Sequence, residues 1–263
     1  MKTIVVCIKQ VPDTQRVTGE AMKPDGTINR AALPAVFNPE DRQALEAALA
    51  VKDACGGKVI AVTMGLPAAT AILREALYRG ADEAYLVTDR KAAGSDTLAT
   101  SYILSQAVKK FKPDLVFCGR QAIDGDTAQT GPQIAEKLGF PALTYLEALK
   151  VEGEVALATR DIGTGIETDR VTLPALFTVT EKFGALRPAD VRRVMKFKKA
   201  EIPTLSCEDI GCEDDRCGFA GSPTAVNKIV SVVLAGGDYR EVAPTDEGIK
   251  ALVKELRDEH TIG

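Results

Sequence analysis

The sequence predicts an α/β fold, namely a doubly wound, mostly parallel sheet with added antiparallel strands and an extended C-terminal arm that ends in a helix. Three observations predict it. Up to about residue 140, short β-branched runs alternate with segments of helical periodicity, as in parallel strands joined by crossover helices. After residue 141 the pattern changes to paired short strands, and beyond about residue 203 periodic segments become sparse.

The first half supplies the parallel strands and their helices. Strands are predicted at residues 3–8, 58–64, 83–88 and 114–118, each nearly continuously apolar, as expected where helices cover both faces of a sheet. A first helix is predicted after Asn38-Pro39, because Glu40 and Asp41 in its first turn are favourable start signals. Further helices are predicted at residues 67–79, 95–111 and 126–138.

The second half is predicted to extend the sheet with antiparallel strands. Residues 148–151 and 155–160 flank Glu152-Gly153-Glu154 as a hairpin, and residues 167–173 and 175–180 form a second pair. A helix is expected over residues 187–196, with Pro188 in its first turn.

The chain is expected to divide into an α/β domain, residues 1–203, and an arm, residues 204–263. The arm ends in an amphipathic helix over residues 246–259, with an apolar stripe of Ile249, Leu252, Val253 and Leu256. Such a segment cannot build its own core. We therefore expect it to dock on the chain's own domain or on a partner subunit.

Composition is that of an ordinary soluble protein. Of the 263 residues 45% are hydrophobic and 27% charged, and the net charge is −4, so no basic face is available for nucleic acid. The first apolar run is too short for a signal peptide, and no stretch approaches the ~20 apolar residues of a membrane span. We expect a cytoplasmic protein with neither nucleic acid nor membrane as a partner.

Cysteine usage fits a reducing compartment. Three of the six cysteines lie in apolar strand patterns or near a helix end, as free thiols do. Cys207, Cys212 and Cys217 are spaced C-x4-C-x4-C in an acidic loop and could hold a metal, but the usual C-x2-C pairs are absent and the only histidine is His260. Ordinary loop thiols are the favoured interpretation, and no metal site is predicted.

A ligand is expected beyond the carboxyl ends of the parallel strands. The turn after the fourth strand, residues 119–131, is the richest in binding chemistry. Gly119 and Gly125 would let the backbone approach a ligand closely, and the free N–H groups of a helix opening at residues 126–130 suit a phosphate. Arg120, Thr127 and Gln129 could add hydrogen bonds.

The same turn also fits a solvated loop with a capped helix start. Asp126 would then be the N-cap, with Gln129 completing a capping box. Ser95-Asp96-Thr97, after the third strand, allows the same two interpretations. The residue chemistry favours neither of them.

Familiar catalytic and nucleotide fingerprints are missing from the sequence. There is no G-x-G-x-x-G after a strand and no G-x-x-x-x-G-K-[ST], and the lone His260 makes a Ser/His/Asp or Cys/His triad implausible. No catalytic residue is predicted. A nucleotide-binding fold of this kind positions a cofactor that performs the chemistry.

The chain resembles, nearly end to end, the beta subunit of electron-transfer flavoproteins. The resemblance rests on five blocks: the opening residues 7–13; Asn38-Pro39 with Ala44-Leu45-Glu46; Met64-Gly65 with Gly80-Ala81-Asp82; residues 119–131, the most specific; and residues 167–178 with Leu173-Pro174-Ala175. In that family the beta subunit holds an AMP beneath an FAD that sits mainly on the alpha subunit. An alpha subunit is therefore the implied partner, and the arm is expected to dock on it.

By this resemblance and the strand-end positions, the cofactor-binding residues would be Cys7, Asn38, Pro39, Glu40, Asp41, Met64, Asp96, Thr97, Gly119, Arg120, Gln121, Ala122, Ile123, Asp124, Gly125, Asp126, Thr127, Ala128, Gln129 and Thr130.

The chain is more similar to the electron-bifurcating branch of anaerobes. There a second FAD replaces the AMP, accepts hydride from NADH, and sends one electron to ferredoxin or flavodoxin and the other to the alpha-subunit FAD. Gly125 stands where the AMP form usually has an Asp, and a flavin ring needs that room; residues 93–100 and 221–224 also look like this branch. FAD is expected rather than AMP, and oxidoreductase activity only in the complex. A subunit with structural AMP and a stand-alone adenine-nucleotide binder remain alternatives.

The sequence departs from the AMP-type family in one segment. The N-E-P-R-Y-x-x-L-P loop that anchors partner dehydrogenases there is replaced at residues 183–191 by F-G-A-L-R-P-A-D-V. The resemblance therefore implies a flavin-dependent dehydrogenase as the partner, either acyl-CoA dehydrogenase-like or of another kind.

Overall fold

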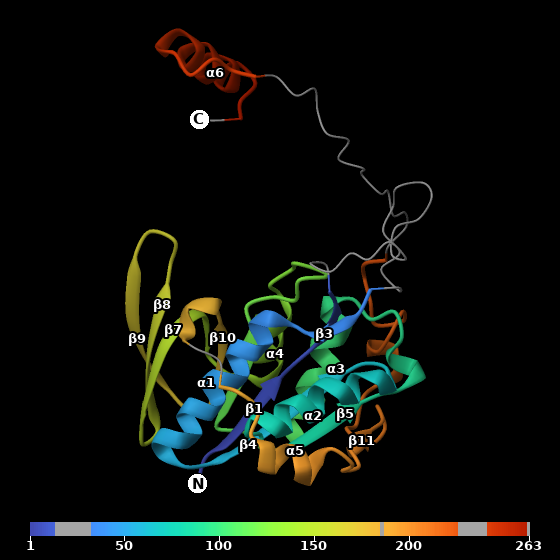
Figure 1. The fold of residues 1–263 in the computed structure, drawn as a ribbon. Helices are drawn as coiled ribbons and strands as arrows, with labels where there is room; N and C mark the ends of the chain where they lie inside the picture. The colour runs from blue at the N-terminus through green and yellow to red at the C-terminus, as the bar shows by residue number, and fades with distance from the viewer. Residues whose placement is uncertain (14–32, 185–186, 226–240, 262–263) are drawn as a thin grey trace.

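A computed structural model describes residues 1–13, 33–184, 187–225 and 241–261 (Figure 1). Nine strands form one sheet in the order β11-β5-β4-β1-β6-β10-β7-β8-β9, and β2 pairs with β3 in a small second sheet. The strands are β1 Thr3–Cys7, β2 Gln10–Pro12, β3 Ala35–Phe37, β4 Lys58–Met64, β5 Glu83–Val87, β6 Leu115–Gly119, β7 Ala142–Glu152, β8 Val155–Asp161, β9 Ile166–Thr172, β10 Ala175–Val179 and β11 Thr204–Leu205. The helices are α1 Pro39–Cys55, α2 Thr70–Arg79, α3 Thr97–Lys110, α4 Thr130–Leu138, α5 Val191–Phe197 and α6 Asp246–Asp258, with 3-10 turns η3 Pro67–Ala69, η4 Arg90–Ala92, η5 Glu181–Phe183 and η6 Asp214–Arg216.

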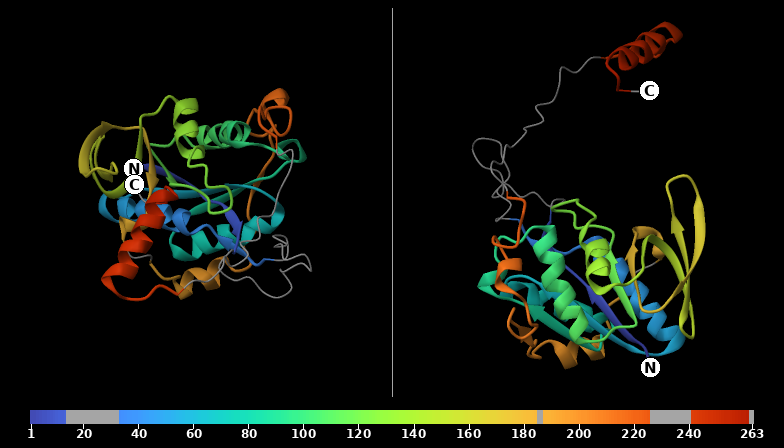
Figure 2. Two further views of the ribbon diagram at one scale, coloured as in Figure 1. Left: turned by 90° about the horizontal axis from the view of Figure 1, so that it is seen from above. Right: turned by 180° about the vertical axis from the view of Figure 1, so that it is seen from behind.

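Helices cover both faces of the parallel part of the sheet, which confirms the doubly wound prediction. Ile4 and Val6 of β1 pack into a core with α1 and α2, whereas Val5 and Cys7 pack into a second core with α3 and α4. Figure 1 shows α1 and α2 on the near face, and the view from behind in Figure 2 shows α3 and α4 on the other. Because alternate residues of each central strand enter different cores, the strands read as continuously apolar.

The hairpin predicted around Gly153 is present. β7 and β8 pair antiparallel up to Glu152 and Val155, and β9 pairs antiparallel with β8. The prediction for the next strand was wrong: β10 does not pair with β9 but runs parallel to β6 and β7 inside the sheet. The reason is visible in the burial, because all of Ala175–Val179 is buried, as a strand covered on both faces must be, whereas β9 alternates between exposed and half-buried residues.

Two helix starts differ from the prediction. α4 begins at Thr130 rather than at residue 126, since Asp126 adopts a left-handed φ of 49° that cannot begin a helix. α5 begins at Val191, because the side chain of Asp190 accepts the amide N–H groups of Arg192 and Arg193 and caps the helix there. Pro188 therefore precedes the helix rather than lying in its first turn.

The arm has two differently placed parts. β11 extends the sheet by pairing parallel with β5, and Leu205, Cys207 and Cys217 are buried against the α3 face. By contrast, α6 has no buried residue and lies away from the sheet in Figures 1 and 2. The division at residue 203 stays a prediction. Parts of two predicted segments, residues 185–186 and 226–240, lie outside the described residues.

Across the described parts of the chain, the structure contains no helix with the length and apolar character needed to cross a membrane.

Candidate functional site

A cavity of about 400 Å³ opens where the strand order of the sheet reverses. From β1 the chain goes to β4 and then β5 on one side, whereas β6 pairs on the other side of β1, with Cys7 beside Cys118 in register. Crossover helices on opposite faces leave a crevice at such a point, and it is where ligands bind in open α/β sheets. The cavity is lined by Cys7, Ile8, Lys9, Asp41, Met64, Ser95, Asp96, Thr97, Thr100, Leu104, Cys118, Gly119, Arg120, Gln121, Ala122, and each residue from Gly125 to Gly131.

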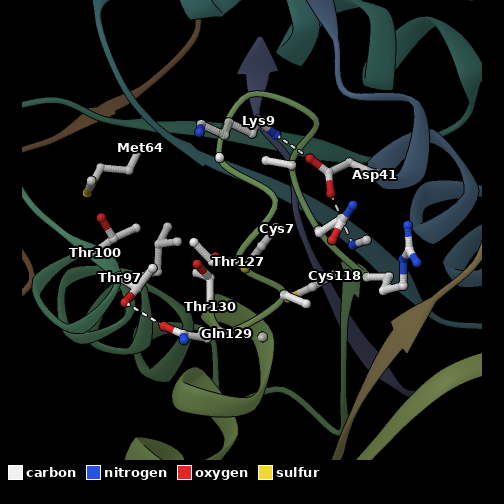
Figure 3. A pocket seen from close by; sticks show the side chains of 18 of the residues that line it. Cys7, Lys9, Asp41, Met64, Thr97, Thr100, Cys118, Thr127, Gln129 and Thr130 are labelled. Carbon is white, nitrogen blue, oxygen red and sulfur yellow. Dashed lines mark hydrogen bonds between the residues drawn. The ribbon is translucent and has the colours of Figure 1, made fainter. Parts of the chain in front are cut away.

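Most of the residues predicted from the sequence line this cavity, and five do not. The loop after β6, the ends of β1 and β4, and the start of α3 all meet there (Figure 3). The predicted residues that do not line it are Asn38, Pro39, Glu40, Ile123 and Asp124. Two of them, Asn38 and Glu40, instead hold the loop after β6, to which Ile123 and Asp124 belong.

Asn38 and Glu40 brace this loop, residues 120–129, from behind. The Asn38 amide is fully buried, donates to the carbonyl of Gln121 at 2.9 Å and accepts the N–H of Ile123 at 3.2 Å. The Glu40 carboxylate accepts the Gln121 N–H at 3.0 Å and pairs with Arg120 at 2.7 Å. Loop amides that would otherwise be unsatisfied in a partly buried position are thereby fixed.

Asp41 joins the ends of β1 and β6. Its carboxylate accepts the N–H of Lys9 at 2.7 Å and the N–H of Gly119 at 3.0 Å (Figure 3). Burial raises the pKa of Asp41 from its usual 3.8 to about 7, against the opposing effect of hydrogen bonds from Asn38, Lys9 and Gly119. A Cβ at Gly119 would lie 2.4 Å from Asp41 Oδ1, so only glycine allows this close approach.

The start of α4 presents free backbone donors to the cavity. Its N-cap, Gln129, makes no side-chain capping hydrogen bond, because its Oε1 accepts the Thr97 hydroxyl at 3.0 Å instead. The start of α3 is different, since Asp96 accepts the N–H groups of Leu98 and Ala99. The predicted capping box at Asp126 and Gln129 is therefore wrong, and α4 is the helix whose N–H groups and dipole suit a phosphate.

Hydroxyl groups and one lysine complete the polar lining. Figure 3 shows Thr97 and Thr100 from α3 near Thr127 and Thr130 from the loop and α4. Lys9 lies at the opposite edge, where its ammonium pairs with Asp124 at 2.7 Å. Sequence reasoning did not select Lys9, although it lies two residues after the end of β1. Ile8, Thr100 and Leu104 also line the cavity and were not selected, whereas Ser95 and Gly131 lie in segments that the sequence did single out.

A protein-family comparison adds an independent observation. The model described as "Electron transfer flavoprotein domain" matches residues 25–210, well over half of the chain. The chain belongs to the electron transfer flavoprotein family. It is 43% identical to the electron transfer flavoprotein subunit beta of Megasphaera elsdenii over 95% of this chain and 97% of that protein. It is 44% identical to the caffeyl-CoA reductase-Etf complex subunit CarD of Acetobacterium woodii. It is also 41% identical to the acryloyl-CoA reductase electron transfer subunit gamma of Anaerotignum propionicum. Each of these two comparisons covers 98% of this chain and 99% of the relative.

The cavity of this electron transfer flavoprotein beta-subunit homologue combines backbone donors, hydroxyls and one lysine with a partly apolar lining. Its two thiols, Cys7 and Cys118, lie beside each other, and their hydrogen bond together with burial raises the pKa of Cys118 well above its usual value, which keeps it protonated. None of the lining residues forms a nucleophile–base pair in hydrogen-bond contact. Amide donors, hydroxyls and a lysine around a partly apolar crevice are the features of a nucleotide site.

Proposed function

We propose that this chain is the beta subunit of an electron-bifurcating electron transfer flavoprotein. It binds FAD in the cavity at the end of β1 and β6, takes electrons from NADH, and delivers them to an alpha-subunit FAD and to a low-potential carrier, ferredoxin or flavodoxin. The observation that supports this most strongly is the crevice at the strand-order reversal, bounded by the uncapped start of α4 and a braced glycine-containing loop.

The protein's own contribution is to hold and orient the cofactor. The N–H groups at the start of α4 and the hydroxyls of Thr97, Thr127 and Thr130 would take the pyrophosphate, since a helix N-terminus favours negative charge. The Asn38 and Glu40 brace keeps the loop rigid, so that little ordering is needed on binding. When bound, FAD would supply hydride acceptance and one-electron transfer.

The proposal of FAD over AMP draws on Gly125. This residue lines the cavity, and a Cβ added there would meet no heavy atom within 4 Å. A side chain at this position would therefore extend into open space that a larger cofactor needs. Structural AMP, with no flavin on this subunit, is the second candidate.

We further propose that the chain works in the cytoplasm with an alpha subunit and a flavin-dependent dehydrogenase of the acyl-CoA type. The names of two relatives, a caffeyl-CoA reductase-Etf complex subunit and an acryloyl-CoA reductase electron transfer subunit, support this partner class. Both names describe reduction of a CoA thioester.

The test is a flavin count on the chain co-produced with its alpha subunit, followed by anaerobic addition of NADH. Two FAD per heterodimer, both reduced by NADH, with ferredoxin reduced only when an enoyl-CoA and the dehydrogenase are present, is the expected result. One FAD with AMP released on denaturation would replace the proposal by its second candidate. A chain that stays monomeric beside the alpha subunit and binds adenine nucleotide alone would overturn both.

The Gly125→Asp variant separates the two cofactors further. It is expected to lose the beta-subunit flavin while the heterodimer stays assembled, since the added side chain fills space beside the cavity without contacting the core. Gly125→Ala is the matched control and is expected to keep its flavin. Full flavin content in Gly125→Asp would argue against this use of Gly125.

A further inference from the structure

Three cysteines from the arm meet beneath α3, away from the cofactor cavity. The Sγ atoms of Cys207, Cys212 and Cys217 all lie within 4.8 Å of one another. Cys207 and Cys217 are buried and Cys212 is half-buried. Two turns bring the cysteines together. In the first, the Cys212 N–H donates to the Cys207 carbonyl at 2.9 Å, and in the second, the 3-10 turn η6 leads from Cys212 back to Cys217.

The spacing of the sulfurs matches one metal ion rather than a cluster. Zinc–sulfur bonds of ~2.3 Å in a tetrahedron place the sulfurs roughly 3.8 Å apart. Sulfurs within 4.8 Å need to move inward by less than ~1 Å to reach this arrangement. In a [4Fe–4S] cluster each cysteine binds a different iron atom, which requires sulfurs farther apart.

The surroundings of the thiols also fit a bound cation. The Asp89 carboxylate accepts the Cys207 N–H at 3.0 Å and lies beside the Cys207 thiol, so it places negative charge at the edge of the group. A cation bound among three sulfurs this close together would be stabilised by all three of them.

We propose that Cys207, Cys212 and Cys217 bind a single thiophilic divalent ion, zinc by preference, with water in the fourth position. Three thiolates select zinc over magnesium or calcium, because soft sulfur ligands disfavour hard cations. Each thiol releases its proton to solvent as the ion binds. The site ties three points of the arm together, in a segment that otherwise contains only a two-residue strand and a 3-10 turn.

This ion would fasten the arm to α3 and, through it, to the edge of the cofactor cavity. Between the second and third cysteines, the Glu213 N–H donates to the Tyr102 hydroxyl at 2.9 Å. After the third cysteine, Ser222 accepts the N–H of Asp96 at 2.9 Å, and the hydroxyl of Thr224 donates to the Asp96 carboxylate at 2.7 Å. Asp96 caps α3 and lines the cavity. The inference does not rest on the identity of the cofactor.

The test is metal analysis of the full chain co-produced with its alpha subunit in zinc-supplemented medium. About one zinc per beta subunit is expected to depend on the cluster. Cys212→Ser is the principal variant, since this half-buried position tolerates the change best, and Cys55→Ser is the matched control, because Cys55 is exposed and outside the group. Zinc affinity should fall at least roughly tenfold in Cys212→Ser, as loss of even an indirect partner costs that much.

Cobalt gives a second readout that is independent of electron transfer. After chelation and anaerobic loading with Co²⁺, the difference spectrum between wild type and Cys212→Ser should contain sulfur-to-cobalt charge-transfer absorption, and Cys55→Ser should match wild type. Equal zinc content in all three proteins with no such difference would overturn the proposal. So would a Cys207–Cys217 disulfide found by alkylation and mass mapping of protein kept free of oxygen and of added thiols until analysis.

Discussion

Gly119 is the residue at which β6 ends and the close contact with α1 begins. An added Cβ would lie 2.4 Å from Asp41 Oδ1 and 2.8 Å from the backbone of both Glu40 and Asp41. Because backbone atoms cannot move aside cheaply, Gly119→Ala is expected to lower the free energy of unfolding by about 1–3 kcal/mol and to reduce the bound nucleotide. Denaturant unfolding and nucleotide release on denaturation measure the two effects.

Gly125→Ala is the control for this prediction. No heavy atom lies within 4 Å of its added Cβ, so its free energy of unfolding should change by no more than about 0.5 kcal/mol. If the two variants were equally stable, the close approach of Gly119 to Asp41 would not be a constraint on the fold.

Asp41 gives the chain a pH-dependent stability of predictable sign. Burial raises its pKa to about 7, so between about pH 4 and pH 7 the folded chain holds a proton that the unfolded chain has released. The free energy of unfolding therefore falls as the pH rises through this window, by about 1.4 kcal/mol for each unit of pH.

The measurement is denaturant unfolding of the nucleotide-free wild type and Asp41→Asn at about pH 5 and about pH 7.5. The amide does not titrate, so the fall in stability should be smaller in the variant, and the difference between the two proteins isolates this residue. An identical pH dependence would mean that Asp41 is ionised in the folded chain throughout the window.

Elements whose sequence signals agreed were predicted well. α1 carries proline and acidic residues in its first turn, and it starts where these residues predict. The start of α4 was predicted wrongly because aspartate is a common N-cap residue. In the structure Asp126, like Ala128, has a left-handed backbone conformation instead. No local signal encodes that choice, since the brace from Asn38 and Glu40 is distant in sequence.

Part of the candidate site could likewise be predicted from the sequence, and part could not. The loop after β6 could be selected because the carboxyl ends of parallel strands meet at one edge. Lys9 was overlooked, and Glu40 was expected to contact the ligand although it contacts the loop, because side-chain direction depends on tertiary packing. The sequence allowed a metal at the three cysteines but favoured ordinary loop thiols, since a C-x4-C spacing does not reveal that the chain turns back on itself.

The start of α4 supplies a prediction at the scale of an element. Gln129 is an N-cap residue without a capping hydrogen bond, and because Pro132 has no N–H, an Asp or Asn at this position can cap only the Gly131 N–H. Gln129→Asp and Gln129→Asn should therefore each stabilise the nucleotide-free chain by only about 0.5 kcal/mol. Both changes alter the contact with Thr97, but only aspartate adds negative charge where a phosphate would lie. Gln129→Asp should therefore weaken nucleotide binding about tenfold relative to Gln129→Asn.

Calorimetric titration of the nucleotide-free variants with FAD or AMP measures this difference, and denaturant unfolding measures the capping effect. Equal affinities of the aspartate and asparagine variants would place the phosphate elsewhere in the cavity. The result would then leave the Lys9 edge as the better candidate for the negative group.

At the scale of the whole molecule, the α/β sheet with its helices differs from α6 in how its apolar side chains are buried. The sheet buries both faces under helices, whereas α6 carries a row of apolar side chains with no buried residue; Ile249 is 52% and Val253 42% exposed. An amphipathic helix with an uncovered apolar face is typical of a docking segment. We therefore expect α6 to bind the alpha subunit, which the composition of the arm predicts as well.

Ile249→Glu should weaken assembly with the alpha subunit by at least about 2 kcal/mol, roughly thirtyfold in Kd, because it puts a charge into the centre of the docked face. Ala251→Glu is the matched control, since it adds the same charge to an exposed position about 200° around the helix. Neither change should alter the stability of the isolated chain, because no residue of α6 is buried there.

Sedimentation of the mixed subunits measures the affinity. Assembly that is unchanged in Ile249→Glu, or weakened equally in both variants, would show that the apolar face of α6 is not the docking surface.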